Sequence, residues 1–243
     1  MIKQDIVNTY IELFTRGEML KGEKFINECI PLELQEDKDI LRLRKECNDR
    51  MADIRRWNRE GRPYPGTHAI AEFNGFPKFV LAKEKIELNK EHGIILDIGC
   101  YSAVFLGGMN SNKYFCWGVD IHKELVGILQ KGESGGIMYV FANSENLPFP
   151  DGKFDVVTAF DILEHVVDLD KSILEIERVC KDGGLIIVNL PRTTPGYVDE
   201  SFEHLRMFSD EGIQDIWGDK KGFKMYDCKD ELGRKTWFFT YTK

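Results

Sequence analysis

Two acidic residues, each at the end of an apolar run, carry the most informative chemistry of this sequence. Asp97 lies in the run Ile94–Ile98, which is followed by Gly99, and Asp120 follows the run Cys116–Val119. A glycine after a buried strand lets the backbone approach a ligand, and a carboxylate after the next strand can accept hydrogen bonds from both hydroxyls of a ribose. The pattern therefore predicts a nucleoside site at the edge of a parallel sheet.

The turn after the first of these runs argues against a dinucleotide. A nicotinamide dehydrogenase carries G-x-G-x-x-G at this place, where the glycines bring the backbone onto the pyrophosphate. Here residues 97–103 read D-I-G-C-Y-S-A, so that fingerprint is missing. An adenosine without phosphates fits better, and a dehydrogenase is the weaker hypothesis.

Composition and charge exclude several classes of protein. The chain has 243 residues, of which 42% are hydrophobic and 30% charged, as is typical of a globular protein. Its net charge of −8 repels phosphate backbones and disfavours a nucleic-acid partner. No apolar run approaches the roughly 20 residues that span a bilayer, and the polar N-terminus leads into no signal-type apolar core. We expect a cytoplasmic protein with no membrane partner, and the sequence leaves its oligomeric state open.

The six cysteines, at positions 29, 47, 100, 116, 180 and 228, form no C-x-x-C pair. This spacing argues against a zinc site, an iron–sulfur cluster or a radical cofactor. Several of the cysteines lie in apolar runs, where cysteine acts as a small buried hydrophobe. We expect reduced cysteines and no metal site.

The hydrophobic pattern divides the chain into two parts. From residue 5 to about residue 60 apolar residues recur at helical spacing, and Pro31 separates two helical stretches. After a Gly/Pro-rich turn at 61–66, Pro77 opens a helix that runs to about residue 91. We predict an N-terminal helical extension over 1–76 and an α/β domain over 77–243.

In the second part, continuous apolar runs alternate with helical segments, which predicts a parallel sheet covered on both faces. The last two runs, 223–227 and 235–242, flank a turn at 231–233 and predict an antiparallel hairpin. Strands are expected at 94–98, 114–119, 137–141, 154–160 and 185–190, and helices at 103–110, 122–131, 162–167 and 170–179.

Several further segments carry a family pattern. Residues 143–157 read N-S-E-N-L-P-F-P-D-G-K-F-D-V-V, residues 163–166 read L-E-H-V, residues 177–184 read E-R-V-C-K-D-G-G, and residues 204–209 read H-L-R-M-F-S. With the turn at 97–99, and in this order, they resemble class I S-adenosylmethionine-dependent methyltransferases of the type that includes the ubiquinone and menaquinone biosynthesis enzymes. The resemblance covers roughly residues 79–242.

The resemblance implies an α/β fold, Rossmann-like and doubly wound, whose seven-stranded, mostly parallel sheet ends in a C-terminal antiparallel hairpin. It also implies S-adenosylmethionine as the cofactor, at the carboxyl ends of the first strands. By position in the family's motifs, Asp97 would help to hold the amino group of the methionine moiety, and Asp120 would take the ribose hydroxyls. The other cofactor-binding candidates are Gly99, Cys100 and Tyr101 near the methionine, Ile121 and His122 beside the adenine, Asn143 and Ser144 at the adenine edge, and Phe160 and Asp161 beside the methionine and the methyl-transfer channel.

A few positions depart from the family pattern or have a structural alternative. Tyr101 and Ala103 stand where the family usually has small residues, often glycine, so the Tyr101 ring must point away from the cofactor or close over it. Asn143 stands where the family usually has aspartate, and its amide oxygen can still accept a hydrogen bond. For Asp97 the structural alternative is a cap on the following helix.

Methyl transfer from a sulfonium needs alignment more than acid–base chemistry. A base is required only when the acceptor must lose a proton. The resemblance makes His165 the candidate catalytic residue, with a structural role as the alternative. We expect His204 to be structural or substrate-facing, and His68 to lie in a surface turn.

The region after the fourth strand helps to define the acceptor. It contains neither an Asn/Asp-Pro-Pro-aromatic motif nor a Pro-Cys pair, which disfavours amino methylation of adenine or glutamine and covalent attack on a pyrimidine. We predict a methyltransferase whose acceptor is a small molecule, with residues 191–201 shaping the acceptor pocket and the helical extension as a lid. The alternatives are a non-catalytic binding or regulatory protein of the same fold, an RNA or protein methyltransferase, and an aminopropyl transferase.

Overall fold

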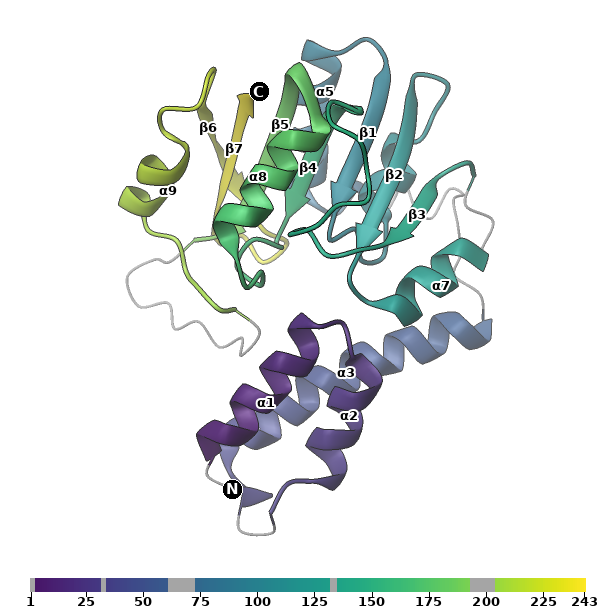
Figure 1. Cartoon of the computed structure of the whole chain (residues 1–243), viewed down its shortest axis with the longest axis vertical. Helices are drawn as coiled ribbons and strands as arrows, with labels where there is room; N and C mark the ends of the chain where they lie inside the picture. The colour runs from purple at the N-terminus through teal and green to yellow at the C-terminus, as the bar shows by residue number, and fades with distance from the viewer. Residues whose placement is uncertain (1–2, 32–33, 61–72, 132–134, 193–203) are drawn as a thin grey trace.

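The computed structural model describes residues 3–31, 34–60, 73–131, 135–192 and 204–243. Its centre is a seven-stranded sheet in the order β3-β2-β1-β4-β5-β7-β6, in which β7 alone runs antiparallel to its neighbours (Figure 1). The strands are β1 (Gly93–Ile98), β2 (Tyr114–Asp120), β3 (Met138–Phe141), β4 (Phe154–Phe160), β5 (Cys180–Pro191), β6 (Lys224–Lys229) and β7 (Lys235–Thr242). The predicted Rossmann-like sheet with a C-terminal hairpin is confirmed.

Helices cover both faces of this sheet. They are α5 (Pro77–Asn89), α6 (Val104–Met109), α7 (Lys123–Lys131), α8 (Leu169–Val179) and α9 (Asp210–Trp217). Successive side chains of a strand point to opposite faces. Ile95 of β1 accordingly belongs to the apolar cluster that includes residues of α5, α6 and α7, whereas Leu96 belongs to the cluster that includes residues of α8 and α9. Because both faces are buried, the strands need apolar residues at consecutive positions. No helix in the described ranges is long and apolar enough to cross a membrane.

Two predicted elements of the sheet domain differ from the structure. Residues 162–167, predicted as a helix, form turns instead. The Arg206 guanidinium donates hydrogen bonds to the carbonyl oxygens of Leu163, Val166 and Val167, so these groups are satisfied without helical hydrogen bonds. Strand β5 is also longer than predicted, because Cys180 already pairs with Phe154 ahead of a register shift.

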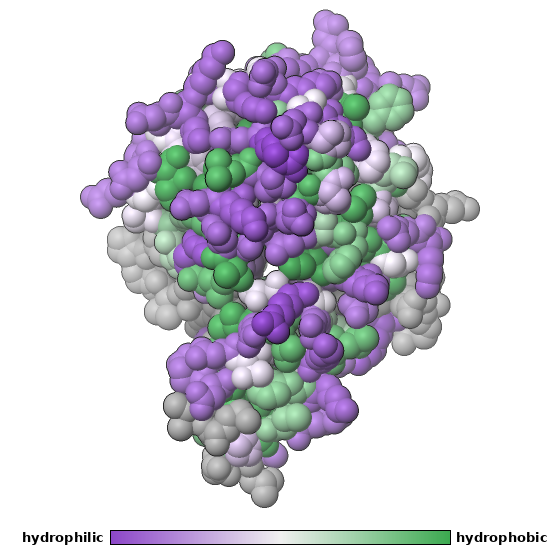
Figure 2. All heavy atoms as spheres, viewed as in Figure 1, coloured by the Kyte–Doolittle hydropathy of each residue, from purple (hydrophilic) through white to green (hydrophobic). Residues whose placement is uncertain are grey.

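The N-terminal extension folds as α1 (Lys3–Thr15), α2 (Met19–Glu28) and α3 (Lys38–Glu60). The first predicted helical stretch is therefore two helices, divided at Gly17, whose φ is +71°. The helices bury a cluster of their own, which includes Ile6, Tyr10, Ile26, Leu43 and Met51. Figure 2 shows the extension as a narrower lobe beneath the sheet domain, with polar and apolar side chains interspersed over this face.

The extension lies against the sheet domain at the turn that follows β2. The ring centroid of Phe14, in α1, is 5.3 Å from that of His122. A Cβ atom on Gly17 would lie 1.9 Å from the carbonyl oxygen of Ile121, so glycine permits the close approach of these two backbones. Phe73, near the proposed division at residues 76 and 77, is buried in the core of the sheet domain.

We expect Gly17→Ala to displace the extension from the turn after β2. The added methyl group would meet the Ile121 carbonyl at a residue whose φ already disfavours a side chain. Overpacking and a left-handed backbone together cost about 2 to 4 kcal/mol. Urea unfolding measures this loss, and limited proteolysis reports whether α1 has separated.

Gly127→Ala is the matched control, because a Cβ atom at this position in α7 meets nothing within 4 Å. Alanine is the better helix former there, so this variant should gain about 0.5 to 1 kcal/mol. Equal stabilities for the two variants would contradict the close contact at Gly17.

Candidate functional site

A cavity of about 670 Å³ lies at the carboxyl ends of β1, β2 and β4, against the helical extension. Open α/β sheets bind ligands at such an edge, where the strand order reverses, and here β1 lies between β2 and β4. The cavity brings together every residue that the sequence assigned to the site: Asp97, Gly99, Cys100, Tyr101, Asp120, Ile121, His122, Asn143, Ser144, Phe160, Asp161 and His165. Their individual roles stay predictions.

Asp120 is a buried carboxylate that the surrounding hydrogen bonds keep ionised. Its Oδ1 accepts the backbone N–H of His122 at 2.9 Å and lies 2.8 Å from His122 Nδ1, and its Oδ2 accepts the backbone N–H of Tyr101 at 3.0 Å. Burial alone would raise the pKa of Asp120, but these interactions outweigh it and lower the pKa. A carboxylate has about four lone-pair sites, and these contacts use three of them, so Asp120 can still accept a hydrogen bond from a ligand.

Asp97 is a second buried carboxyl group, and its environment acts in the opposite direction. Thr158 in β4 donates a hydrogen bond of 2.7 Å to Asp97 Oδ1. Burial raises the pKa of Asp97 to about 7, and the charge of Asp120 adds to this effect, against the hydrogen bond from Thr158 and the charge of Lys78. Asp97 does not cap α6, because that helix has Ala103 at its N-cap and no side-chain cap.

The loop between β1 and α6 keeps a left-handed backbone without glycine at two positions. The φ angles are +38° at Tyr101 and +53° at Ala103, besides +70° at Gly99. Conformations of this kind cost on the order of 1 kcal/mol for a residue with a side chain, which explains why glycine is common at these positions in the family. The Tyr101 ring lines the cavity, with its centroid 6.0 Å from the Arg50 guanidinium carbon of α3, so it lies between the loop and the extension.

Asn143 and Ser144 begin the turn after β3, on another side of the cavity. The Asn143 side-chain oxygen accepts the backbone N–H of Glu145 at 2.9 Å, so it is engaged within its own turn. The hydroxyl oxygens of Ser144 and Ser172 are buried and lie 3.0 Å apart. The turn is therefore held by its own hydrogen bonds. The second lone pair of the Asn143 side-chain oxygen is the one that could accept a hydrogen bond from an adenine.

The structure adds an ion pair that the sequence did not indicate. Lys78, in the first turn of α5, pairs with Asp161 at the end of β4 and lies 3.8 Å from Glu231 in the β6–β7 turn. Burial opposes the charge of Lys78, but these acids outweigh it and raise its pKa. The sequence held one signal for this ion pair. Lys78 directly follows Pro77, at a helix N-terminus, where a cation is disfavoured unless an acid lies nearby.

The extension supplies part of the cavity wall, through Phe14 and Thr15 of α1 and through Glu46, Asp49 and Arg50 of α3. This position agrees with the predicted lid, whose function stays a prediction. The predicted turn at 61–66, His68, and residues 193–201 of the predicted acceptor segment lie outside the described residues.

Comparisons with known proteins give one consistent class. A family model described as a methyltransferase domain matches residues 96–188. The ubiquinone/menaquinone biosynthesis C-methyltransferase UbiE of Francisella tularensis is 38% identical over 91 residues, which are 37% of this chain and 34% of that protein. The uncharacterized protein MJ1123 of Methanocaldococcus jannaschii is 30% identical over 174 residues, 63% of this chain and 82% of that protein. The match thus spans about a third of the UbiE relative's length.

Solved structures give the same fold at lower identity. An S-adenosylmethionine-dependent methyltransferase from Aquifex aeolicus superposes with a TM-score of 0.56 at 16% identity, over 77% of this chain and 97% of that one. YcgJ from Bacillus subtilis superposes with a TM-score of 0.54 at 18% identity, over 68% and 97%.

The strand order and the cavity at the switch point define a Rossmann-like methyltransferase fold. The chain belongs to the class I S-adenosylmethionine-dependent methyltransferases, as the family model and its relatives show. S-adenosylmethionine is the cofactor of this family.

Asp97→Asn should stabilise the cofactor-free protein above pH 7. The folded pKa of about 7 is higher than the ~4 of an exposed aspartate. Between about pH 4 and about pH 7 the carboxyl group of Asp97 is therefore protonated in the folded state and ionised in the unfolded state. The free energy of unfolding falls as the pH rises through this range. Asparagine stays neutral and removes the loss, which amounts to about 4 kcal/mol. Urea unfolding of both proteins at about pH 5 and about pH 8 measures it.

Asp155→Asn provides a control of opposite sign. Burial opposes ionisation of Asp155, but the hydrogen bonds from Lys181 and from the Ile94 backbone N–H outweigh it and lower its pKa. This variant should lose stability at about pH 8. A gain in both variants, or in neither, would mean that the folded protein does not raise the pKa of Asp97.

Proposed function

We propose that this protein transfers the methyl group of S-adenosylmethionine to a small-molecule acceptor. The observation that carries the proposal is the placement of Asp97 and Asp120 on neighbouring strands, facing one cavity that the helical extension covers. The family supports the cofactor, whereas the acceptor class rests on the shape and the walls of the cavity.

Three observations support a fit between the cavity and the cofactor. The buried Nε2 atom of His122 has no hydrogen-bond partner among the described residues. A Cβ atom on Gly99 would lie 2.9 Å from the Ile162 side chain, so only glycine lets the loop backbone lie this close to Ile162 on the cavity wall. Asp97 has a pKa of about 7, and the positive charge of a bound cofactor would favour its ionised form.

In the proposed arrangement the cofactor supplies a methyl group that its positive sulfur already activates. The chain's own residues bind and orient. Asp97 accepts hydrogen bonds from the ammonium group and Asp120 from the ribose hydroxyls. The walls formed by Phe14, Phe79 and Phe160 exclude water from the channel, which favours displacement at the methyl carbon.

The covered cavity favours a small acceptor over a macromolecule. Residues of α1 and α3 line the same cavity as residues at the carboxyl ends of β1, β2 and β4, and Figure 1 shows the extension at this end of the strands. A nucleic acid would also have to approach a chain with a net charge of −8. His165 lines the same cavity as Asp161, and we assign it to the acceptor end of the site. An RNA or protein methyltransferase remains the second candidate, and a non-catalytic binding protein the third.

Asp120→Ala should abolish binding of S-adenosylmethionine or weaken it at least ~100-fold, because the ribose would lose its charged acceptor and the Tyr101 and His122 N–H groups their partner. Titration calorimetry with S-adenosylmethionine and S-adenosylhomocysteine measures the affinity, with NADH as the negative ligand. Asp182→Ala is the matched control, since the Asp182 side chain is 97% exposed. Unchanged affinity in Asp120→Ala would refute the site.

Turnover separates the candidate functions. Purified protein that binds the cofactor should methylate a member of a library of phenols, enols, amines and carboxylates, with S-adenosylhomocysteine as the product. Methylation of RNA or protein only would favour the second candidate. Tight binding of both nucleosides without any turnover would favour the non-catalytic protein.

Cofactor affinity should fall as the pH drops below about 7. Asp97 is protonated there in the free protein and must lose its proton before it can pair with an ammonium group. The affinity then decreases by up to about tenfold per pH unit. Calorimetric titrations between about pH 5.5 and pH 7.5 test this. Asp97→Asn should bind more weakly and show no such dependence, and a parallel slope in that variant would assign the proton to another group.

A further inference from the structure

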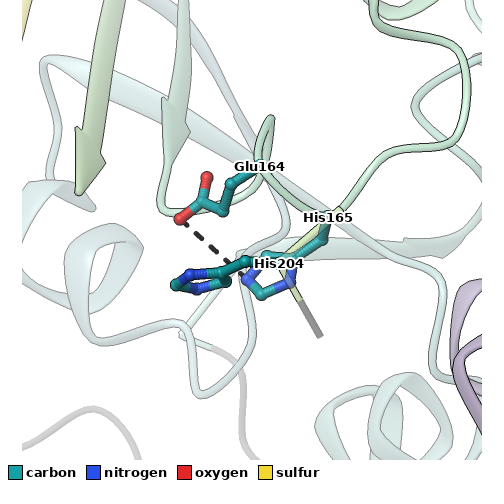
Figure 3. A group of neighbouring side chains, drawn as sticks. All are labelled: Glu164, His165 and His204. Carbon is teal, nitrogen blue, oxygen red and sulfur yellow. Dashed lines mark ion pairs between the residues drawn. The ribbon is translucent and has the colours of Figure 1, made fainter. Parts of the chain in front are cut away.

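Three side chains of metal-ligating type converge beside the cavity, from two distant parts of the chain. Glu164 and His165 follow β4, and His204 precedes α9 (Figure 3). Their ligand atoms all lie within 4.8 Å of one another. His165 Nε2 is 4.0 Å from Glu164 Oε1, and the two imidazole centroids are 4.8 Å apart in an edge-to-face arrangement.

The backbone around this cluster is fixed by hydrogen bonds between its two segments. The Leu205 N–H donates to the carbonyl oxygen of Glu164 at 2.8 Å, directly beside His204. The Arg206 guanidinium donates to the carbonyl oxygens of Leu163 and Val166, on either side of Glu164 and His165. The three side chains are therefore presented together by a rigid scaffold, as a preformed ion site requires.

Burial distinguishes this cluster from a surface group of acids and histidines. The Glu164 side chain is 1% exposed and that of His165 is 17% exposed. A buried carboxylate is stabilised by a nearby cation, and two imidazoles with one carboxylate form a donor set that suits zinc and other divalent transition metals. No cysteine takes part, so the absence of C-x-x-C spacing does not bear on it.

The spacing lies within reach of coordination. Bonds of about 2.1 Å place the ligand atoms of a tetrahedral or octahedral ion roughly 3.0 to 3.5 Å apart. The present spacing of up to 4.8 Å must therefore close by about 1 to 2 Å on binding, which requires rotation of the side chains and not movement of the hydrogen-bonded backbone. Three protein ligands leave at least one coordination position open for water or substrate.

We propose that Glu164, His165 and His204 bind one divalent transition-metal ion at the acceptor end of the cavity. His165 lines the cavity wall together with Val166 and Val167, so the open coordination position faces the space for the acceptor. The ion would select an acceptor that offers an oxygen ligand, such as a hydroxyl or enol, and would lower the pKa of that group. This acceptor preference rests on the proposed function, whereas metal binding does not.

Cobalt titration of the full chain, stripped with a chelator that is then removed, tests the proposal. One equivalent of Co²⁺ should give the visible absorption of a nitrogen- and oxygen-ligated ion, and Zn²⁺ should displace it. Mg²⁺, which prefers oxygen ligands, should not compete at equal concentration. His204→Ala should weaken Co²⁺ binding about tenfold or more, whereas His92→Ala, at an exposed position outside the cluster, should leave it unchanged.

The outcomes separate the ion site from its alternatives. Absence of stoichiometric Co²⁺ and Zn²⁺ binding would overturn the proposal and leave a purely structural imidazole pair. A thiolate-to-cobalt charge-transfer band, or binding unaffected by His204→Ala, would place the ion at cysteines or elsewhere. Glu164→Gln is the second variant, with its fold checked by circular dichroism. Calorimetry with S-adenosylmethionine on the same samples reports on the proposed function independently.

Discussion

Two buried carboxyl groups on adjacent strands determine the organisation of the site. Asp97 and Asp120 end β1 and β2, are 3% and 5% exposed, and destabilise each other when both are charged. The structure resolves this by giving Asp120 the hydrogen bonds of Tyr101 and His122 and by raising the pKa of Asp97 to about 7. The loop conformation and the position of His122 serve this unequal sharing of charge, whereas the hydrogen bond from Thr158 favours the ionised form of Asp97.

Much of this arrangement could be predicted from the sequence. Continuous apolar runs located most strands to within a few residues, because a strand buried on both faces is apolar at most consecutive positions. The residues at the carboxyl ends of those strands necessarily meet at one edge, which is why every assigned residue lines the same cavity. The residues at 143–157 also indicated the protein family, which the periodicity of apolar residues alone does not indicate.

What the sequence did not reveal depends on contacts between distant residues. Residues 162–167 have helical periodicity but form turns, since Arg206, about 40 residues away, binds their carbonyl groups. The pairing of Lys78 with Asp161 joins residues 83 positions apart. The close approach of Gly17 to Ile121 requires the extension to be already docked. None of these contacts leaves a periodic signal, because each involves single residues on separate elements.

The separate core of the extension also has a kinetic consequence. Its helices pack mainly on one another within residues 3–60, so their contacts are short in sequence and close early. The sheet is different, because β1 pairs with β4 and Asp97 meets Thr158 only after 61 further residues have been made. During synthesis the extension leaves the ribosome first. All the residues that the extension needs for its own core are thus present in the growing chain before the strands that form the cavity.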